Sequence, residues 1–194
     1  YINIKWESFK DHCVLPELVD SHTHLVFGGN RATEYSMRLN GATYAEIAQA
    51  GGGIISTMKM TNEASTDELF KSACQRIKQI NSYGIGTIEI KSGYGLNIEK
   101  EVEVSLIIDR LKKEFAPEVQ IFNTFMAAHA VPKEYNSGRE YIDSVVIPAL
   151  DKVHSEVQID AVDIFHEEGY FSSEDTMYLF DYCRQKGLAL KSHA

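Results

Sequence analysis

The sequence predicts an α/β fold, specifically the first part of a (β/α)8 TIM-type barrel, and two observations support this. Five apolar segments of strand length alternate with segments of helical periodicity, which is typical of parallel β/α architecture. Histidine and other titratable residues follow these segments one after another, whereas an open doubly wound sheet concentrates its site near one switch point. We therefore expect a closed ring of strands, of which about the first five β/α units are present.

The elements are expected in the following order. The strand candidates are apolar runs bounded by turn-forming residues, at 18–26, 85–90, 119–125, 161–165 and 188–192. The first major helix begins with a capping-box pattern from Ser65 to Glu68 and ends at Gly84. Further helices are expected over 98–115, 140–153 and 173–186, and Gly187 ends the last of them.

Composition limits the class of protein. The 194 residues carry a net charge of −9 without a basic stripe, which argues against nucleic-acid binding. No apolar run approaches the length that spans a bilayer, and the N-terminus lacks a signal-peptide core. Three cysteines at unrelated spacings indicate neither a disulfide framework nor a cysteine metal site. We expect a cytoplasmic protein without a membrane partner.

The most informative motif is His22-Thr23-His24 at the end of the first strand candidate. Residues two apart in a strand point to the same side, so the two imidazoles form half of a metal site. His193, at the end of the fifth strand candidate, supplies a third imidazole. This arrangement predicts a metal-dependent hydrolase, although ordinary surface histidines are the alternative for a His-x-His pair by itself.

Two glycine-rich stretches are expected to form loops. Residues 51–53 match no phosphate-binding pattern, so we expect a flexible or tightly turned loop over the barrel mouth. Gly93 and Gly95 flank an aromatic residue, which suggests a turn that presents Tyr94 into a pocket.

Six segments together resemble the imidazolonepropionase family of the amidohydrolase superfamily. They are Leu18-Val-Asp-Ser-His-Thr-His24, Phe27-Gly-Gly-Asn-Arg31, Gly41-Ala-Thr-Tyr-Ala-Glu-Ile47, Gly51-Gly-Gly-Ile54, Glu89-Ile-Lys-Ser-Gly-Tyr-Gly-Leu96 and Ala127-Ala-His-Ala-Val-Pro132. The resemblance extends from about Val14 to Ala194. The His-x-His element alone would indicate only the superfamily, whereas the runs around Arg31 and Tyr94 are specific to this family.

The resemblance implies a metal site and a reaction. His22, His24 and His193 match metal ligands, and the implied cofactor is one zinc or iron ion. The implied reaction is the hydrolytic ring opening of 4-imidazolone-5-propanoate to N-formimidoyl-L-glutamate in histidine degradation, and the implied assembly is a homodimer.

The resemblance also implies a substrate site. Arg31, Tyr94 and His129 match residues that hold the small-molecule substrate, and His129 is the catalytic candidate. The fork of donors on Arg31 suits a carboxylate, and His129 could polarise the carbonyl oxygen or steady an oxyanion, which the sequence leaves open. Taken singly, Arg31 could be a solvated arginine, Tyr94 a packing aromatic and His129 a core histidine.

Three further titratable residues are left outside the predicted site. His166 stands where the family pattern has cysteine, and neither it nor Glu167 is assigned a role. Lys91 could correspond to the bridging lysine of two-metal amidohydrolases, but its Lys-Ser-Gly-Tyr setting matches the single-metal pattern.

The domain expectation is a remnant of an N-terminal β segment over 1–13, followed by a partial barrel over 14–194 truncated at its C-terminus. The family's acidic general base and its aspartate ligand lie beyond residue 194, so we expect the isolated chain to be unstable or inactive. Two alternatives stay open: another amidohydrolase acting on a different heterocycle, as a deaminase or cyclic amidase, or a non-catalytic metal-binding fragment.

Overall fold

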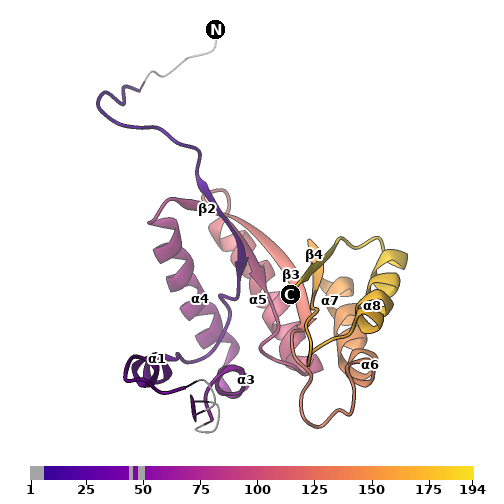
Figure 1. The fold of residues 1–194 in the computed structure, drawn as a ribbon. Coiled ribbons are helices and arrows are strands. Elements are labelled where there is room, and N and C mark those ends of the chain that lie inside the picture. The colour runs from indigo at the N-terminus through magenta and orange to yellow at the C-terminus, as the bar shows by residue number, and fades with distance from the viewer. Residues whose placement is uncertain (1–6, 44–45, 48–50) are drawn as a thin grey trace.

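Five parallel strands form one curved sheet in the computed structural model shown in Figure 1, which describes residues 7–43, 46–47 and 51–194. The strand order in space is the order along the chain, so each strand pairs with its sequence neighbours. The strands are β1 (Leu18–Thr23), β2 (Ile85–Lys91), β3 (Gln120–Ala128), β4 (Ala161–Phe165) and β5 (Leu190–His193). This is the topology of a half-barrel, and the predicted α/β partial barrel is confirmed.

Helices follow four of the five strands. β1 is followed by α1 (Ala32–Leu39), α3 (Ile54–Glu63) and α4 (Thr66–Asn81), and β2 is followed by α5 (Ile98–Phe115). β3 is followed by α6 (Gly138–Tyr141), a π-helical turn (Ile142–Val146) and α7 (Ile147–Glu156), and β4 is followed by α8 (Ser173–Gln185). The described helices therefore connect parallel strands in the way that β/α units require.

The two faces of the sheet differ in character because side chains alternate along each strand. On β2, Ile88 and Ile90 are fully buried in an apolar cluster with residues of α4 and α5. The intervening Glu89 and the following Lys91 are also buried, but they bond to each other, to Thr124 of β3 and to Asp163 of β4. The helix-covered face thus holds the apolar core, and the opposite face, inside the curve, carries the charged groups.

Capping explains where two of these helices begin. Ser65 accepts a hydrogen bond from the backbone N–H of Glu68, whose side chain accepts one from the N–H of Ser65, so the predicted capping box is confirmed. Ser172 and Asp175 form a second capping box at the start of α8. Both boxes satisfy backbone donors that the first turn of a helix leaves without partners.

The structure corrects three element predictions. The first strand ends at Thr23 rather than near residue 26, so His24 lies just beyond it. The helix expected over 140–153 is α6, the π-helical turn and α7 in succession, and the widened turn precedes Pro148, which has no N–H to donate. Helices α1 and α3 were not predicted, because α1 buries no residue and α3 buries threonines rather than an apolar stripe.

The N-terminal segment extends away from the sheet (Figure 1). Residues 7–17 form neither helix nor strand, and residues 1–6 of the predicted β segment lie outside the described residues. The domain division at residue 14 therefore stays a prediction. In the part of the chain that the structure describes, no helix has the length and apolar character needed to cross a membrane.

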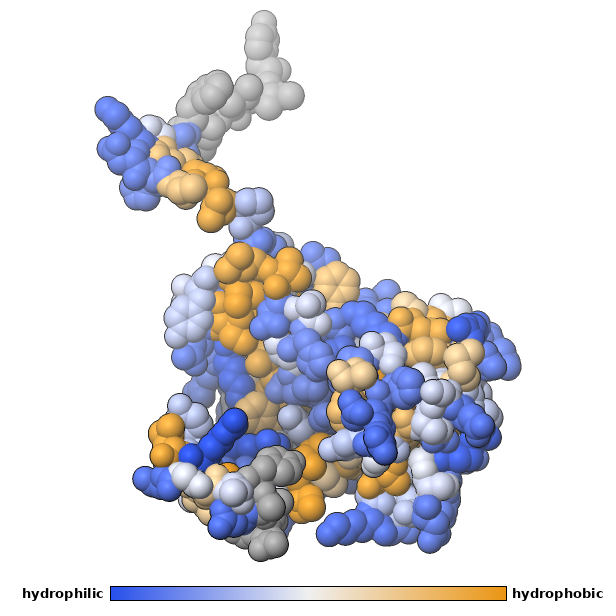
Figure 2. All heavy atoms as spheres, viewed as in Figure 1, coloured by the Kyte–Doolittle hydropathy of each residue, from blue (hydrophilic) through white to orange (hydrophobic). Residues whose placement is uncertain are grey.

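Apolar residues are exposed where the N-terminal segment joins the sheet. Figure 2 shows apolar side chains gathered in this region, and the exposed residues of this segment and of β1 include Val14, Leu15, Leu18 and Val19. Among the described residues, β1 is at one edge of the five-stranded sheet and pairs with β2 alone. The edge is therefore apolar as well as unpaired on its outer side.

Candidate active site at the carboxyl edge of the half-barrel

Four histidines meet at the carboxyl ends of the strands. His22 is in β1, His24 and His129 directly follow β1 and β3, and His193 is the last residue of β5. The ring of His22 is centred 5.7 Å from that of His24 and 4.7 Å from that of His193. His24 stacks on His129 with centroids 4.8 Å apart and an interplanar angle of 10°. The structure therefore brings the predicted ligands from β1 and β5 side by side.

The environment of these rings favours neutral imidazole. Burial, followed by repulsion from His129, lowers the pKa of His24 to about 2, and burial together with the nearby Lys91 also lowers the pKa of His22. Neutral imidazole is the form that binds a metal ion. In addition, Nδ1 of His24 is buried and has no hydrogen-bond partner among the described residues, although such atoms are nearly always satisfied.

The histidines do not form a complete preassembled centre. Within residues 7–43, 46–47 and 51–194, no three His, Cys, Asp or Glu side chains converge closely enough to hold a metal ion. The neutral rings and the unsatisfied Nδ1 of His24 fit an ion with imidazole ligands. The assignment of His22, His24 and His193 as ligands therefore remains a proposal.

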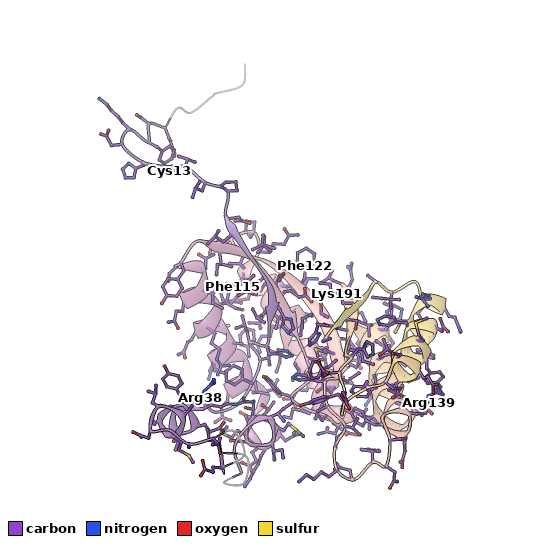
Figure 3. All side chains as sticks on the ribbon, viewed as in Figure 1. Cys13, Arg38, Phe115, Phe122, Arg139 and Lys191 are labelled. Atoms are coloured by element: carbon purple, nitrogen blue, oxygen red, sulfur yellow. The ribbon has the colours of Figure 1, made fainter. Side chains whose placement is uncertain are left out.

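A buried ionic network lies behind His193. Nδ1 of His193 is 3.2 Å from Oδ2 of Asp163, and the same oxygen accepts a hydrogen bond from Lys91 at 2.6 Å. Lys91 also donates to Glu89 at 2.6 Å, and Glu89 accepts further bonds from Lys191, which is labelled in Figure 3, and from Thr124. A carboxylate behind a histidine fixes the orientation of its ring.

The same network determines the ionisation of Glu89. Burial acts to raise the pKa of Glu89, but the hydrogen bonds from Lys191, Lys91 and Thr124 outweigh burial and hold this pKa below its usual value. Lys91 is only 3 % exposed and is committed to two carboxylates. It therefore supports the site electrostatically from beneath the histidines.

Arg31 and Tyr94 line one cavity beside the histidines. The cavity has a volume of about 420 Å³ and is also lined by Phe27, Thr57 and Arg76. This volume is within the range of small-molecule sites. Nε of Arg31 donates to the Thr57 hydroxyl at 2.8 Å, while the Tyr94 ring is centred 5.0 Å from that of His24. Tyr94 thus forms a wall shared by the cavity and the histidine cluster.

His129 is held by the loop after β2. Its Nδ1 lies 2.8 Å from the carbonyl oxygen of Gly93, and its ring is centred 5.4 Å from that of Tyr94. Burial lowers the pKa of His129, with the bond to Gly93 acting in the opposite direction. The structure therefore places all six predicted site residues at one edge of the sheet.

Sequence reasoning missed three residues that support the site. Asp163 is in the middle of β4, and Glu101 and Arg76 are on helices, so no strand-end pattern identifies them. Arg76 donates to the carbonyl oxygens of Leu25 and Phe27 and lies 3.5 Å above the Phe27 ring. No sequence motif marks Arg76, which is partly buried on α4 between Gln75 and Ile77.

Two of the three titratable residues left outside the predicted site, His166 and Glu167, have side chains that bond outside the histidine cluster, whereas Lys91 belongs to the network behind His193. His166 shares a hydrogen bond of 3.1 Å between its Nε2 and the hydroxyl of Ser173 in the first turn of α8. Glu167 is exposed, and its carboxylate accepts the backbone N–H of Glu168. Both have local structural contacts that account for them.

The fold and the site together define a class: a partial parallel β/α barrel with a histidine-lined site at its carboxyl edge. Two solved structures of 5-methylcytosine deaminase from Klebsiella pneumoniae, one liganded with phosphonocytosine and one with 5-fluorocytosine, share this fold, with TM-scores of 0.61 and 0.60. Each match covers 92% of this chain and 39% of the other, at 14% identity. At this identity the likeness concerns the fold.

Sequence relatives are more specific. The chain is 48% identical over 182 residues to imidazolonepropionase of Agrobacterium fabrum, 44% identical to that of Clostridium tetani and 46% identical to that of Shewanella frigidimarina. Each match covers 93% of this chain and 43–44% of the relative. No family model matches the chain. The resemblance inferred from the motifs is therefore confirmed, and the chain spans less than half the length of these relatives.

Proposed function

We propose that the chain is the metal- and substrate-binding half of an imidazolonepropionase, which hydrolyses 4-imidazolone-5-propanoate to N-formimidoyl-L-glutamate in histidine degradation. The observation that carries this proposal is the position of the His22 ring, 5.7 Å from that of His24 and 4.7 Å from that of His193, beside a cavity lined by Arg31 and Tyr94. The identity of 43–48% to imidazolonepropionases supports the choice of substrate.

His22, His24 and His193 would hold one zinc or iron ion. Bound there, such an ion would lower the pKa of a water molecule and so supply hydroxide for hydrolysis at neutral pH. Asp163 keeps the His193 ring oriented through Nδ1, and Lys91 balances the charge of Asp163. These contacts would hold the His193 ring in the orientation that a metal ligand needs.

Arg31 would bind the propanoate carboxylate. Its Nε is already engaged by Thr57 at 2.8 Å, which fixes the plane of the guanidinium and leaves its terminal nitrogens for a carboxylate. Tyr94 stands between Arg31 and the histidines, so it contacts the ring of a ligand whose carboxylate is on Arg31. Burial raises the pKa of Tyr94, which keeps its phenol a hydrogen-bond donor at neutral pH.

The test uses the chain joined to the complementary C-terminal part of the Agrobacterium fabrum relative and reconstituted with zinc or iron. Loss of the ultraviolet absorbance of 4-imidazolone-5-propanoate reports turnover. His22→Ala should abolish turnover and Arg31→Ala should raise KM at least tenfold, since a charged hydrogen bond is worth about 1.5–3 kcal/mol. Exposed His154→Ala and Arg38→Ala are the matched controls, and Arg38 is labelled on α1 in Figure 3.

Two outcomes would refute the proposal in different ways. Turnover of cytosine or guanine in preference to imidazolone propanoate would indicate another amidohydrolase reaction. Stoichiometric metal binding without any turnover would favour a binding role alone. The predicted homodimer is checked on the same preparation by sedimentation equilibrium, which should give twice the chain mass.

A further inference from the structure

Glu101 is a fully buried carboxylate for which the proposed reaction has no use. It lies in the first turn of α5 and is 0% exposed. Within the described ranges no basic side chain forms an ion pair with it. Its oxygens instead accept backbone N–H groups of Gly93 at 2.9 Å, Gly95 at 2.7 Å and Leu96 at 2.9 Å. Burying a carboxylate is costly without such partners, so these three bonds tie its position to the loop conformation.

This loop is the one that presents Tyr94 and contacts His129. The N–H of Gly93 donates to Glu101, and the carbonyl of the same residue is 2.8 Å from Nδ1 of His129. Gly93 has φ +113, and a Cβ at this position would lie 2.7 Å from the Met126 carbonyl oxygen and 2.9 Å from Cβ of His129. The backbone can therefore approach the imidazole this closely only because residue 93 is glycine.

The partner of Nδ1 determines the tautomer of His129. A carbonyl oxygen only accepts hydrogen bonds, so Nδ1 must be the donor. In a ring with a single proton, Nε2 then carries a lone pair and faces away from the loop. Within the described part of the chain Nε2 makes no hydrogen bond, which leaves it available to a ligand.

We propose that Glu101 is a positioning residue which, through Gly93, holds His129 as the Nδ1–H tautomer, so that Nε2 accepts a hydrogen bond from an N–H group of the bound heterocycle. The identity of that heterocycle rests on the proposed function. A carbonyl oxygen or oxyanion has no proton to give to Nε2. His129 thus selects ligands with a ring N–H rather than polarising the carbonyl, which decides between roles that the sequence left open.

The first test measures the tautomer directly on the 194-residue chain labelled with ¹⁵N. Long-range ¹H–¹⁵N correlation spectra distinguish a protonated from an unprotonated ring nitrogen, and His129→Gln assigns the resonances. We expect the pattern of the Nδ1–H form for His129. The Nε2–H form in the wild type would overturn the proposal, and this result needs no variant at position 101.

The second test asks whether Glu101 maintains that tautomer. Glu101→Gln replaces one acceptor oxygen with an amide group that opposes a backbone N–H, so the His129 resonances should shift towards a mixture of tautomers. Glu99→Gln removes the same charge from an exposed position in the same turn and should leave them unchanged. Wild-type His129 resonances in folded Glu101→Gln would overturn the role of Glu101. If that variant fails to fold, hydrogen exchange in the wild type replaces this test. The amides of Gly93, Gly95 and Leu96 should then exchange slowly, and fast exchange would overturn the role of Glu101.

The third test examines the acceptor with two probes. 2-Imidazolidinone carries ring N–H groups, whereas 1,3-dimethyl-2-imidazolidinone has the same carbonyl without them. Titration with the first should shift the Nε2 resonance of His129, and titration with the second should not. Equal shifts, or no shift with either probe, would contradict the acceptor role.

These readouts are independent of turnover and of metal loading. An assembled protein that fails to open imidazolone propanoate would refute the proposed function while leaving the tautomer measurement intact. Conversely, an Nε2–H tautomer in a protein that turns over this substrate would refute the present proposal alone.

Discussion

Gly93 and Cys183 illustrate how the surroundings of a single residue decide its chemical behaviour. Gly93 has a positive φ, and a Cβ at this position would collide with Met126 and His129, so its lack of a side chain is a structural requirement. Cys183 is a fully buried thiol among apolar residues of α8 and its neighbours, where it behaves as a small apolar side chain. Neither property can be assigned from residue type alone.

Gly93→Ala should destabilise the chain by about 3 kcal/mol or more, because backbone strain and overpacking add. Gly84 is the matched control: it also has a positive φ, but a Cβ there meets nothing within 4 Å. Gly84→Ala should cost about 1 kcal/mol from strain alone. Urea unfolding measures both, and equal losses would show that the contacts of Gly93 with Met126 and His129 are unimportant.

Cysteine modification should separate Cys183 from Cys13. Burial raises the pKa of Cys183 to about 12, so at pH 8 only about one molecule in ten thousand carries the reactive thiolate. Cys13, labelled in Figure 3 on the extended N-terminal segment, is exposed. Iodoacetamide at pH 8 should alkylate Cys13 first, as read by mass spectrometry, and should reach Cys183 only in denaturant. Equal rates in the folded chain would contradict the buried position.

At the scale of elements, strands β2, β4 and β5 are joined by charge as well as by backbone hydrogen bonds. Lys91 of β2 bonds to Asp163 of β4, and Lys191 of β5 bonds back to Glu89 of β2. These contacts cross the concave face beneath the histidines. They therefore couple the stability of the half-barrel to the geometry of the site.

Lys91→Met should destabilise the chain by about 3–5 kcal/mol, because buried Asp163 loses its lysine partner and buried Glu89 keeps only Lys191. Exposed Lys113→Met, which removes a lysine paired with Asp109 on α5, is the control and should change stability by about 0.5 kcal/mol or less. Urea unfolding at pH 7 provides the comparison. Similar losses in the two variants would indicate that the buried network contributes no more than a surface pair.

The same network predicts an acid-sensitive stability. The pKa of Glu89 in the folded state lies below the unfolded value of about 4.3, so folding stabilises the ionised carboxylate relative to the protonated one. This contribution is fully present above the unfolded pKa and is lost as pH falls through the folded pKa. Unfolding free energy should therefore decrease below about pH 4 in the wild type, and the decrease should be smaller in Glu89→Gln.

At the scale of the whole molecule, a five-stranded sheet has two edges that a closed barrel lacks. In the part of the chain that the structure describes, β1 pairs only with β2, and β5 pairs only with β4. β1 also exposes Leu18 and Val19, at 57% and 65%. Unpaired apolar edge strands promote association between chains.

We predict that the isolated chain self-associates through the β1 edge. Val19→Lys places a charge on this strand and should reduce the weight-average mass measured by sedimentation at tens of micromolar. Met177→Lys, an exposed apolar position on α8, is the control and should leave association unchanged. A monomeric wild-type chain at these concentrations would refute the prediction.

Much of the fold could be predicted because its signals are local. Apolar runs located five strands, and the Ser65–Glu68 pattern located the start of α4. Helices α1 and α3 were not predicted because they bury few apolar side chains. The first strand was predicted too long because the apolar pattern continues through Leu25 and Val26, which pack against α4 after β1 has ended.

The sequence by itself determined the order of the five strands, the helices α4, α5 and α8, and the identity of the six candidate site residues, since these follow from local periodicity and from motifs. Only the tertiary structure decided which groups support them: Asp163 contacts His193, and Glu101 binds Gly93, which in turn contacts His129. The physical reason is that folding brings together residues separated in sequence, by 30 positions for Asp163 and His193 and by 36 for Gly93 and His129. Lys91 and Asp163 are 72 residues apart in sequence, and no local sequence pattern predicts that Nζ of Lys91 lies 2.6 Å from Oδ2 of Asp163.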